Sequence, residues 1–201
     1  MKLPQIELAV ARAERTIYER LKLPDDVEVA FSGSSEYLIP EDGVGGRTRK
    51  SDLVVFSVDV AKNPSEQIIF EMLMHELCHA GRWQMNEEWM RVLFDGIINE
   101  GIATVFEETV AHEEERTVFL TAVLERSNEE NENILASLKG KLFDGGYDYH
   151  EIFFDGNDRL PRWAGYSLGY FLVKKYLAMT DKTIEQAFAD KYADFKIALE
   201  K

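Results

Sequence analysis

The chain has 201 residues, of which 45% are hydrophobic, so it has enough apolar material for a core and is not wholly disordered. It carries 23 Lys and Arg against 37 Asp and Glu, which gives a formal net charge of −14. Partners such as nucleic acid or an anionic lipid surface need a positive field, so this charge disfavours both. The single cysteine excludes an intramolecular disulfide framework and fits a reducing compartment.

The N-terminal segment mixes charged and apolar residues and contains no hydrophobic run typical of a signal peptide. No segment approaches the ~18 uninterrupted apolar residues that a membrane span needs. These features predict a cytoplasmic protein that does not bind membranes, while secretion by an unusual route stays open. The sequence leaves the oligomeric state open.

Apolar residues at helical spacing predict an amphipathic helix over residues 4–22. Residues 27–31 alternate well enough for a short strand, and Leu53–Val58 has the β-branched and aromatic content of a second strand. Between the two strands, residues 40–46 are rich in glycine, which predicts a flexible or tightly turning loop.

The second strand is followed by helix-starting residues, with Asn63 predicted as the N-cap and Pro64 in the first position. This helix is expected to end at Gly81. Further helices are predicted over residues 87–111 and 113–139. A run of glutamates covers the junction of these two helices, and such a run is typical of a solvated helix face.

Residues 140–162 are rich in Gly, Asp and aromatic residues and predict a long loop, of a length that often carries function. Helical patterns return over residues 163–177 and 183–200. No repeat or linker interrupts the chain, so residues 1–201 are predicted to form a single domain. Its predicted class is α+β, mainly helical with a small N-terminal β-sheet.

The most informative segment is His75-Glu76-Leu77-Cys78-His79, since a His-Glu-x-x-His match is rarely accidental in a chain with only four histidines. Residues four apart on a helix lie one above the other, so both imidazoles can reach one ion. Glu76 is rotated about 100° from His75, so its carboxylate lies beside the ion and can deprotonate a metal-bound water. Imidazole ligands and an open position for water indicate zinc.

A third protein ligand is needed, and Glu100 lies in the middle of the next predicted helix. It is flanked by Ile98, Gly101 and Ile102, an apolar neighbourhood in which close helix packing is expected. A buried carboxylate is costly unless it is paired or metal-bound. Glu100 is therefore predicted as the third metal ligand.

The sequence HELCH followed by NEGIA resembles the gluzincin metallopeptidases, whose third ligand is a glutamate on the helix after the HExxH helix. The chain is most similar to a bacterial family described only as predicted zinc-dependent proteases. The likeness covers roughly residues 43–177 and rests on the glycine pair with the following strand, Arg82, the EGIA-like segment and the motif Tyr166-Ser-Leu-Gly-Tyr. It implies a zincin-like fold with an HExxH active-site helix.

One position departs from the thermolysin-like gluzincins, which have an acidic residue four positions after the ligand glutamate. This chain has Thr104 there. The acceptor that orients a metal-bound imidazole must then come from elsewhere, for instance from Glu107 or a backbone carbonyl.

In a zinc peptidase, the oxyanion of the tetrahedral intermediate needs zinc and one further donor. Tyr166 is predicted as this second donor, because a phenol stays protonated at pH 7. It also matches the tyrosine with this role in the aminopeptidase-like gluzincins that the chain resembles. Alternatively, Tyr166 simply packs the C-terminal helix.

Together these features predict a zinc peptidase that acts on a peptide or protein substrate. The alternative is a non-catalytic zinc-stabilised interaction or regulatory module that uses the acidic helix as its contact surface. An accidental match would predict no metal. Glu76 favours the enzyme, since a structural zinc does not require it.

Substrate is expected to add as a strand along Leu53–Val58, and the acidic surface predicts a preference for basic or neutral peptides. The natural substrate and the choice between endo- and exopeptidase action stay open.

Overall fold

The computed structural model describes residues 3–86 and 89–200. The chain divides into two units, one made of residues 1–87 and 106–120 and the other of residues 88–105 and 121–201. The fold is mainly helical, and the described residues contain one three-stranded sheet, which confirms the α+β class. The prediction that residues 1–201 form one domain stays a prediction.

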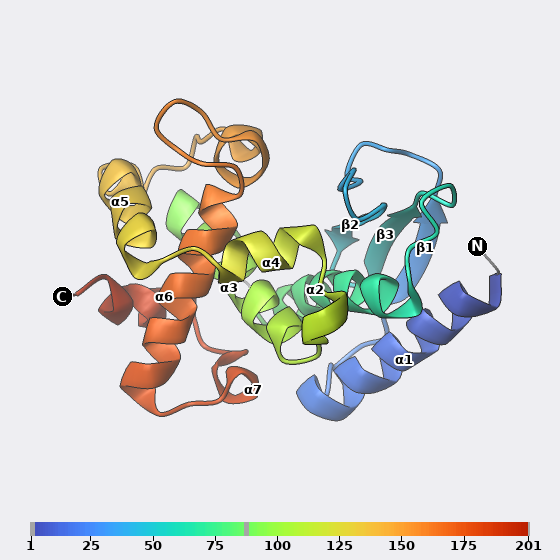
Figure 1. Cartoon of the computed structure of the whole chain (residues 1–201). Coiled ribbons are helices and arrows are strands. Elements are labelled where there is room, and N and C mark those ends of the chain that lie inside the picture. Colours follow the sequence, from blue (N-terminus) through green and yellow to red (C-terminus); the bar gives the residue numbers. More distant parts are fainter. Residues whose placement is uncertain (1–2, 87–88, 201) are drawn as a thin grey trace. The chain divides into compact units, whose positions relative to one another are not determined.

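In the first unit, helix α1 (Leu3–Leu21) confirms the helix predicted over residues 4–22. Its residues Ala9, Ala13 and Ile17 recur every four positions and are fully buried, as expected for one face of an amphipathic helix. Helix α1 packs against helix α2 (Figure 1).

The sheet has the strand order β1-β3-β2, so that β3 lies in the middle. Strands β1 (Glu28–Ser32) and β3 (Leu53–Val58) are parallel and confirm the two predicted strands. Strand β2 (Val44–Lys50) pairs antiparallel with β3. The expectation that a peptide adds along Leu53–Val58 is wrong, because both edges of this strand are already paired.

Strand β2 was missed because its first residues belong to the stretch over 40–46 that was predicted as a loop. The glycines here serve close packing rather than a turn. A Cβ atom at Gly45 would collide with the backbone carbonyl of Tyr37, and one at Gly46 would lie 2.6 Å from Cγ of Glu76. Glycine inside a strand often marks such a close approach.

Helix α2 (Glu66–Met85) begins two residues later than predicted. Asn63 is not the N-cap: it has a left-handed φ of 48°, and the hydroxyl of Ser65 accepts the capping hydrogen bond from the amide of Ile68. The helix also continues past Gly81, which is buried within it. Helix α2 packs against α1 and against strands β2 and β3 (Figure 1).

Helix α3 (Leu93–Glu108) contributes to both units and is shorter than the helix predicted over residues 87–111. The predicted first residue, Glu87, lies outside the described residues. The single helix predicted over residues 113–139 is wrong. The segment forms three pieces, namely a 3-10 turn (Glu113–Glu115), α4 (Val118–Leu124) and α5 (Asn128–Leu138).

The breaks between these pieces are caused by capping side chains. The hydroxyl of Thr117 accepts a hydrogen bond from the amide of Leu120 at the start of α4. Ser127 and Glu130 form a capping box at the start of α5. Ser and Thr side chains compete with helical hydrogen bonding in this way. The run of glutamates favoured one continuous helix, so these capping residues were not recognised in the sequence.

In the second unit, residues 140–162 form the predicted loop apart from a helical turn over residues 149–155, of which Glu151–Asp155 are π-helical. Helix α6 (Ala164–Thr180) confirms the helix predicted over residues 163–177. The last predicted helix is replaced by α7 (Ile184–Ala187) and a 3-10 segment (Tyr192–Leu199).

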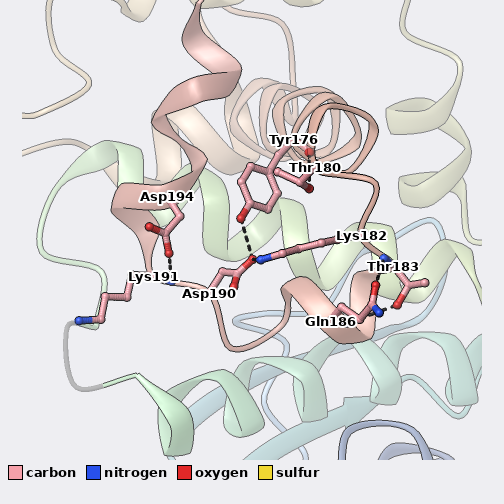
Figure 2. A network of polar contacts seen from close by, with 8 residues as sticks. All are labelled: Tyr176, Thr180, Lys182, Thr183, Gln186, Asp190, Lys191 and Asp194. Atoms are coloured by element: carbon pink, nitrogen blue, oxygen red, sulfur yellow. Dashed lines mark hydrogen bonds and ion pairs between the residues drawn. The ribbon is translucent and has the colours of Figure 1, made fainter.

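Figure 2 shows the polar contacts around the break after α7. A carboxylate oxygen of Asp190 accepts hydrogen bonds from the hydroxyl of Tyr176, at 2.7 Å, and from the ammonium of Lys182, at 2.6 Å. Thr183 and Gln186 form the capping box that starts α7. Asp190 thus connects the chain after α7 to helix α6. Nowhere in the two described ranges is a helix both long and apolar enough to cross a bilayer.

Candidate metal centre

Helix α2 presents His75 and His79 from the same face, as the spacing predicted. Their ring centroids lie 4.8 Å apart with the planes at 80°. Both side chains are buried. The Nδ1 atom of His75 lies 2.9 Å from Oε2 of Glu107, which leaves Nε2 of His75 as the nitrogen available to a metal ion.

The sequence left two candidates for the acceptor that faces the imidazole, namely Glu107 and a backbone carbonyl. In the structure the acceptor for His75 is Glu107. Its side chain is fully buried, and burial raises its pKa above the usual carboxyl range, while the hydrogen bond and charge of His75 lower it. Thr104, which stands at the position that is acidic in the thermolysin-like enzymes, bonds its own helix through the carbonyl of Glu100 at 2.8 Å. Glu107 therefore takes over the orienting role towards His75.

Glu76 is buried on α2 beneath strand β2. The hydroxyl of Thr48 lies 3.0 Å from Oε2 of Glu76 and 2.8 Å from its backbone carbonyl. Gly46 leaves the space that the Glu76 side chain occupies. Sequence reasoning missed Thr48. The glycine pair before Thr48 was the sequence signal for a close approach of backbone to Glu76, but this pair was interpreted as part of a loop.

Glu100 lies in the middle of α3 and is 3% exposed. Its neighbours Ile97, Ile98 and Ile102 are fully buried, which confirms the apolar surroundings expected from the sequence. The hydroxyl of Tyr149 donates a hydrogen bond of 2.6 Å to Oε1 of Glu100. The second oxygen of the carboxylate is then the one suited to a metal.

Tyr149 was not predicted. Burial raises the pKa of its hydroxyl well above the usual value, and the negative charge of Glu100 raises it further. The phenol therefore keeps its proton and acts as a donor to the carboxylate. The ring stacks on Phe153 at a centroid distance of 4.5 Å, which fixes its direction.

Tyr166 lies near the start of α6 and is 7% exposed. One turn further along, Gly169 meets Gly101 of α3 so closely that a Cβ atom at either position would collide with the other backbone. The two motif glycines thus allow α6 and α3 to cross at short distance. Tyr166 also hydrogen-bonds Tyr149, which places it in the same polar chain as Glu100.

Within the described residues, His75, His79 and Glu100 form a buried group that could hold a metal ion. The group offers one ligand atom from each residue, and these atoms all lie within 4.8 Å of one another. Two imidazole nitrogens and a carboxylate oxygen are the donor set of a catalytic zinc site with one position left for water. Cys78, within the same motif, is buried and is not a member of the group.

The fold and this group define an α+β protein with a buried His-His-Glu group that could hold a metal ion. Residues 8–196 match the family described as predicted Zn-dependent protease (DUF2268), and the chain belongs to this family. A search of the curated proteins and a search of the solved structures each found no match.

Proposed function

We propose that this protein is a zinc-dependent peptidase. The zinc ion would be held by His75, His79 and Glu100, and Glu76 would be the general base. The observation that carries the proposal is the placement of Glu76, whose buried carboxylate is next to His75 in sequence and is bound by Thr48. A structural zinc site has no use for an oriented carboxylate that is not a ligand.

A zinc ion held by these residues would supply Lewis-acid polarisation of the peptide carbonyl and would lower the pKa of a bound water. Glu76 would accept the proton of the attacking water at a carboxylate oxygen and return it to the leaving amine. Thr48 would keep the carboxylate in position for both transfers. Tyr166 would donate its hydroxyl hydrogen to the oxygen on which negative charge develops.

The substrate would bind in an extended conformation along the outer edge of β2. Ile39 already pairs with Val44 at the start of this edge, where its amide donates to the Val44 carbonyl. Along a strand, the backbone N–H and C=O groups of every second residue point to the same edge. After Val44, the residues whose backbone groups point to the outer edge are therefore Gly46 and Thr48. Because these two residues lie over Glu76, a peptide added there would pass beside the general base.

Replacement of Glu76 by Gln tests this function. Gln keeps the shape of the side chain but cannot accept the proton, so turnover of a peptide mixture should fall by at least ~10². Zinc content should stay at the parental level. Equal peptidase activity in Glu76→Gln would overturn the mechanism. A parental protein that binds zinc and cleaves no peptide would instead support the non-catalytic zinc module.

A further inference from the structure

Strand β2 carries a basic outer edge in a chain whose net charge is −14. Its exposed residues are Arg47, Arg49 and Lys50, and its sequence VGGRTRK contains no acidic residue. The neighbouring strand β3, with the sequence LVVFSV, has no charged residue at all. The cations of β2 therefore have no acidic partner within the paired strand.

The two arginines lie in different parts of the β2 register. Gly46 and Thr48 face α2, where they contact Glu76. Successive side chains of a regular strand point to opposite faces, so Arg47 lies on the face away from α2. The register with β3 shifts between Thr48 and Lys50, so Arg49 belongs to an irregular, exposed stretch of the same edge. Arg47 pairs with Val55 of β3, which is an apolar neighbour.

The two arginines differ in their contacts, and Arg49 is the one whose charge is left available. The guanidinium of Arg47 lies over the ring of Tyr37, 5.0 Å from its centroid, and donates to the Tyr37 hydroxyl. The same hydroxyl donates a hydrogen bond of 2.8 Å to the carboxylate of Glu36, so the charge of Arg47 already has an acidic residue nearby. Arg49 is exposed, and no hydrogen bond or ion pair of its side chain is found among the residues that the structure describes.

We propose that Arg49, together with Arg47, selects acidic side chains of a peptide bound along β2. The inference rests on the proposed function, which places the substrate on this edge. Directly opposed residues of adjacent strands lie about 5 Å apart, and opposite charges at this distance stabilise the pair. More distant charges are screened over ~8 Å at physiological salt. The local cations therefore outweigh the net charge of the chain, from which a preference for basic or neutral peptides was expected.

The test measures peptide binding separately from cleavage. The Glu76→Gln protein is loaded with zinc and titrated into fluorescent peptides of one sequence, with two Glu, two Gln or two Lys at alternate positions. Exposed ion pairs have modest strength, so the Glu peptide should bind roughly three- to tenfold more tightly than the Gln peptide. The Lys peptide should bind most weakly, and added salt should reduce the differences.

Charge reversal at one arginine identifies the source of the preference. In the same background, Arg49→Glu should favour the Lys peptide over the Glu peptide, and Arg49→Gln should reduce the preference without reversing it. Arg15→Glu is the matched control, since Arg15 is an exposed arginine on α1 and its replacement changes the net charge equally. An equal effect of Arg15→Glu and Arg49→Glu would overturn the proposal, as would equal binding of all three peptides.

The outcome also separates this proposal from the proposed function. Tight binding of the Glu peptide, without cleavage by the parental protein, would support the specificity and contradict the peptidase. Cleavage of all three peptides at equal kcat/KM, together with equal binding, would leave the peptidase intact and overturn the specificity.

Discussion

His75 on α2 and Glu100 on α3 are supported by opposite kinds of partner. The imidazole of His75 faces the carboxylate of Glu107, which comes from a regular helix. The carboxylate of Glu100 faces the phenol of Tyr149, which begins the short helical turn that continues as the π-helical residues Glu151–Asp155.

The difference follows from what each ligand needs. A histidine that binds metal through Nε2 carries a proton on Nδ1 and requires an acceptor, and a carboxylate acceptor makes the imidazole a stronger ligand. A glutamate that binds metal through one oxygen requires a donor on the other oxygen. The support of His75 is therefore a carboxylate, whereas the support of Glu100 is a phenol with a raised pKa. The two supports should respond differently to mutation and to pH.

The largest expected effect is the loss of the metal itself. If the group is the zinc site, His79→Ala removes one of three protein ligands, and a site with two ligands should not retain zinc. We expect about one zinc per parental chain after dialysis against a mild chelator, and close to none in the variant. Metal analysis of both proteins checks this. A variant that keeps stoichiometric zinc would place the metal elsewhere.

The next effect concerns Tyr166, the neighbour of Tyr149. If Tyr166 donates to the developing oxyanion, Tyr166→Phe removes about 3 kcal/mol of transition-state stabilisation and lowers kcat roughly a hundredfold. Zinc affinity and melting temperature should stay close to the parental values. Steady-state kinetics on one peptide, with a zinc titration, distinguishes the roles. A variant with parental kcat would leave Tyr166 as a packing residue of α6.

The grouping of His75, His79 and Glu100 was predictable because the signals are local. His75 and His79 are fixed by helical spacing, and Glu100 stands out as a carboxylate among isoleucines. The missing acid at Thr104 showed that an acceptor was needed elsewhere, and Glu107 is on the same helix as Glu100. Each of these inferences uses one helix at a time.

The supporting residues were harder to predict because they come from distant segments. Tyr149 is one of eight tyrosines and is separated from Glu100 by 49 positions. Thr48 lies in strand β2, which the sequence pattern did not reveal. The close approach of β2 to Glu76 requires glycine, and glycine is also a strong signal for a loop. The strands and α1 were predictable from their apolar periodicity. The breaks at Ser127 and Asp190 depend on a few local side-chain hydrogen bonds, which periodicity does not detect.

A smaller effect is expected from the support of Glu100. Tyr149→Phe removes the hydrogen bond to Oε1 and keeps the stacked ring, so zinc affinity should fall about 10-fold, towards the lower end of effects from such outer partners. Tyr147→Phe is the matched control. The charge of Glu100, after burial, contributes to raising the pKa of Tyr147 to about 12. Its hydroxyl lies against Gly96 and makes no hydrogen bond to Glu100 among the described contacts.

Chelator competition with both variants measures this effect. We expect weaker zinc binding only in Tyr149→Phe, with the melting temperature of the zinc-free protein changed little. Equal affinity in the two variants would show that the Tyr149 hydroxyl does not position the ligand. A lowered melting temperature with unchanged zinc affinity would assign Tyr149 a structural role.

The smallest expected effect is that of the buried carboxylate of Glu71, on α2, on the pH dependence of stability. Glu71 lies one turn before His75 and is fully buried. Its carboxylate accepts hydrogen bonds from the Gln67 side chain, at 2.9 Å, and from the amides of His112 and Thr117. Burial raises the pKa of Glu71 to about 7 in spite of these donors, and the charge of Glu107 adds to the rise.

A raised carboxyl pKa means that the folded protein binds a proton that the unfolded chain has already released. The stability contributed by protonated Glu71 is therefore complete below the ordinary carboxyl pKa and is lost as the pH rises through about 7. In Glu71→Gln the group does not titrate. The parental protein should thus lose about 1–2 kcal/mol relative to this variant between about pH 5.5 and pH 7.5. Gln also turns its amide group towards a backbone donor, which costs stability equally at every pH. The difference in slope between the two curves of unfolding free energy against pH is therefore the diagnostic quantity, and parallel curves would show that Glu71 is already ionised throughout this range.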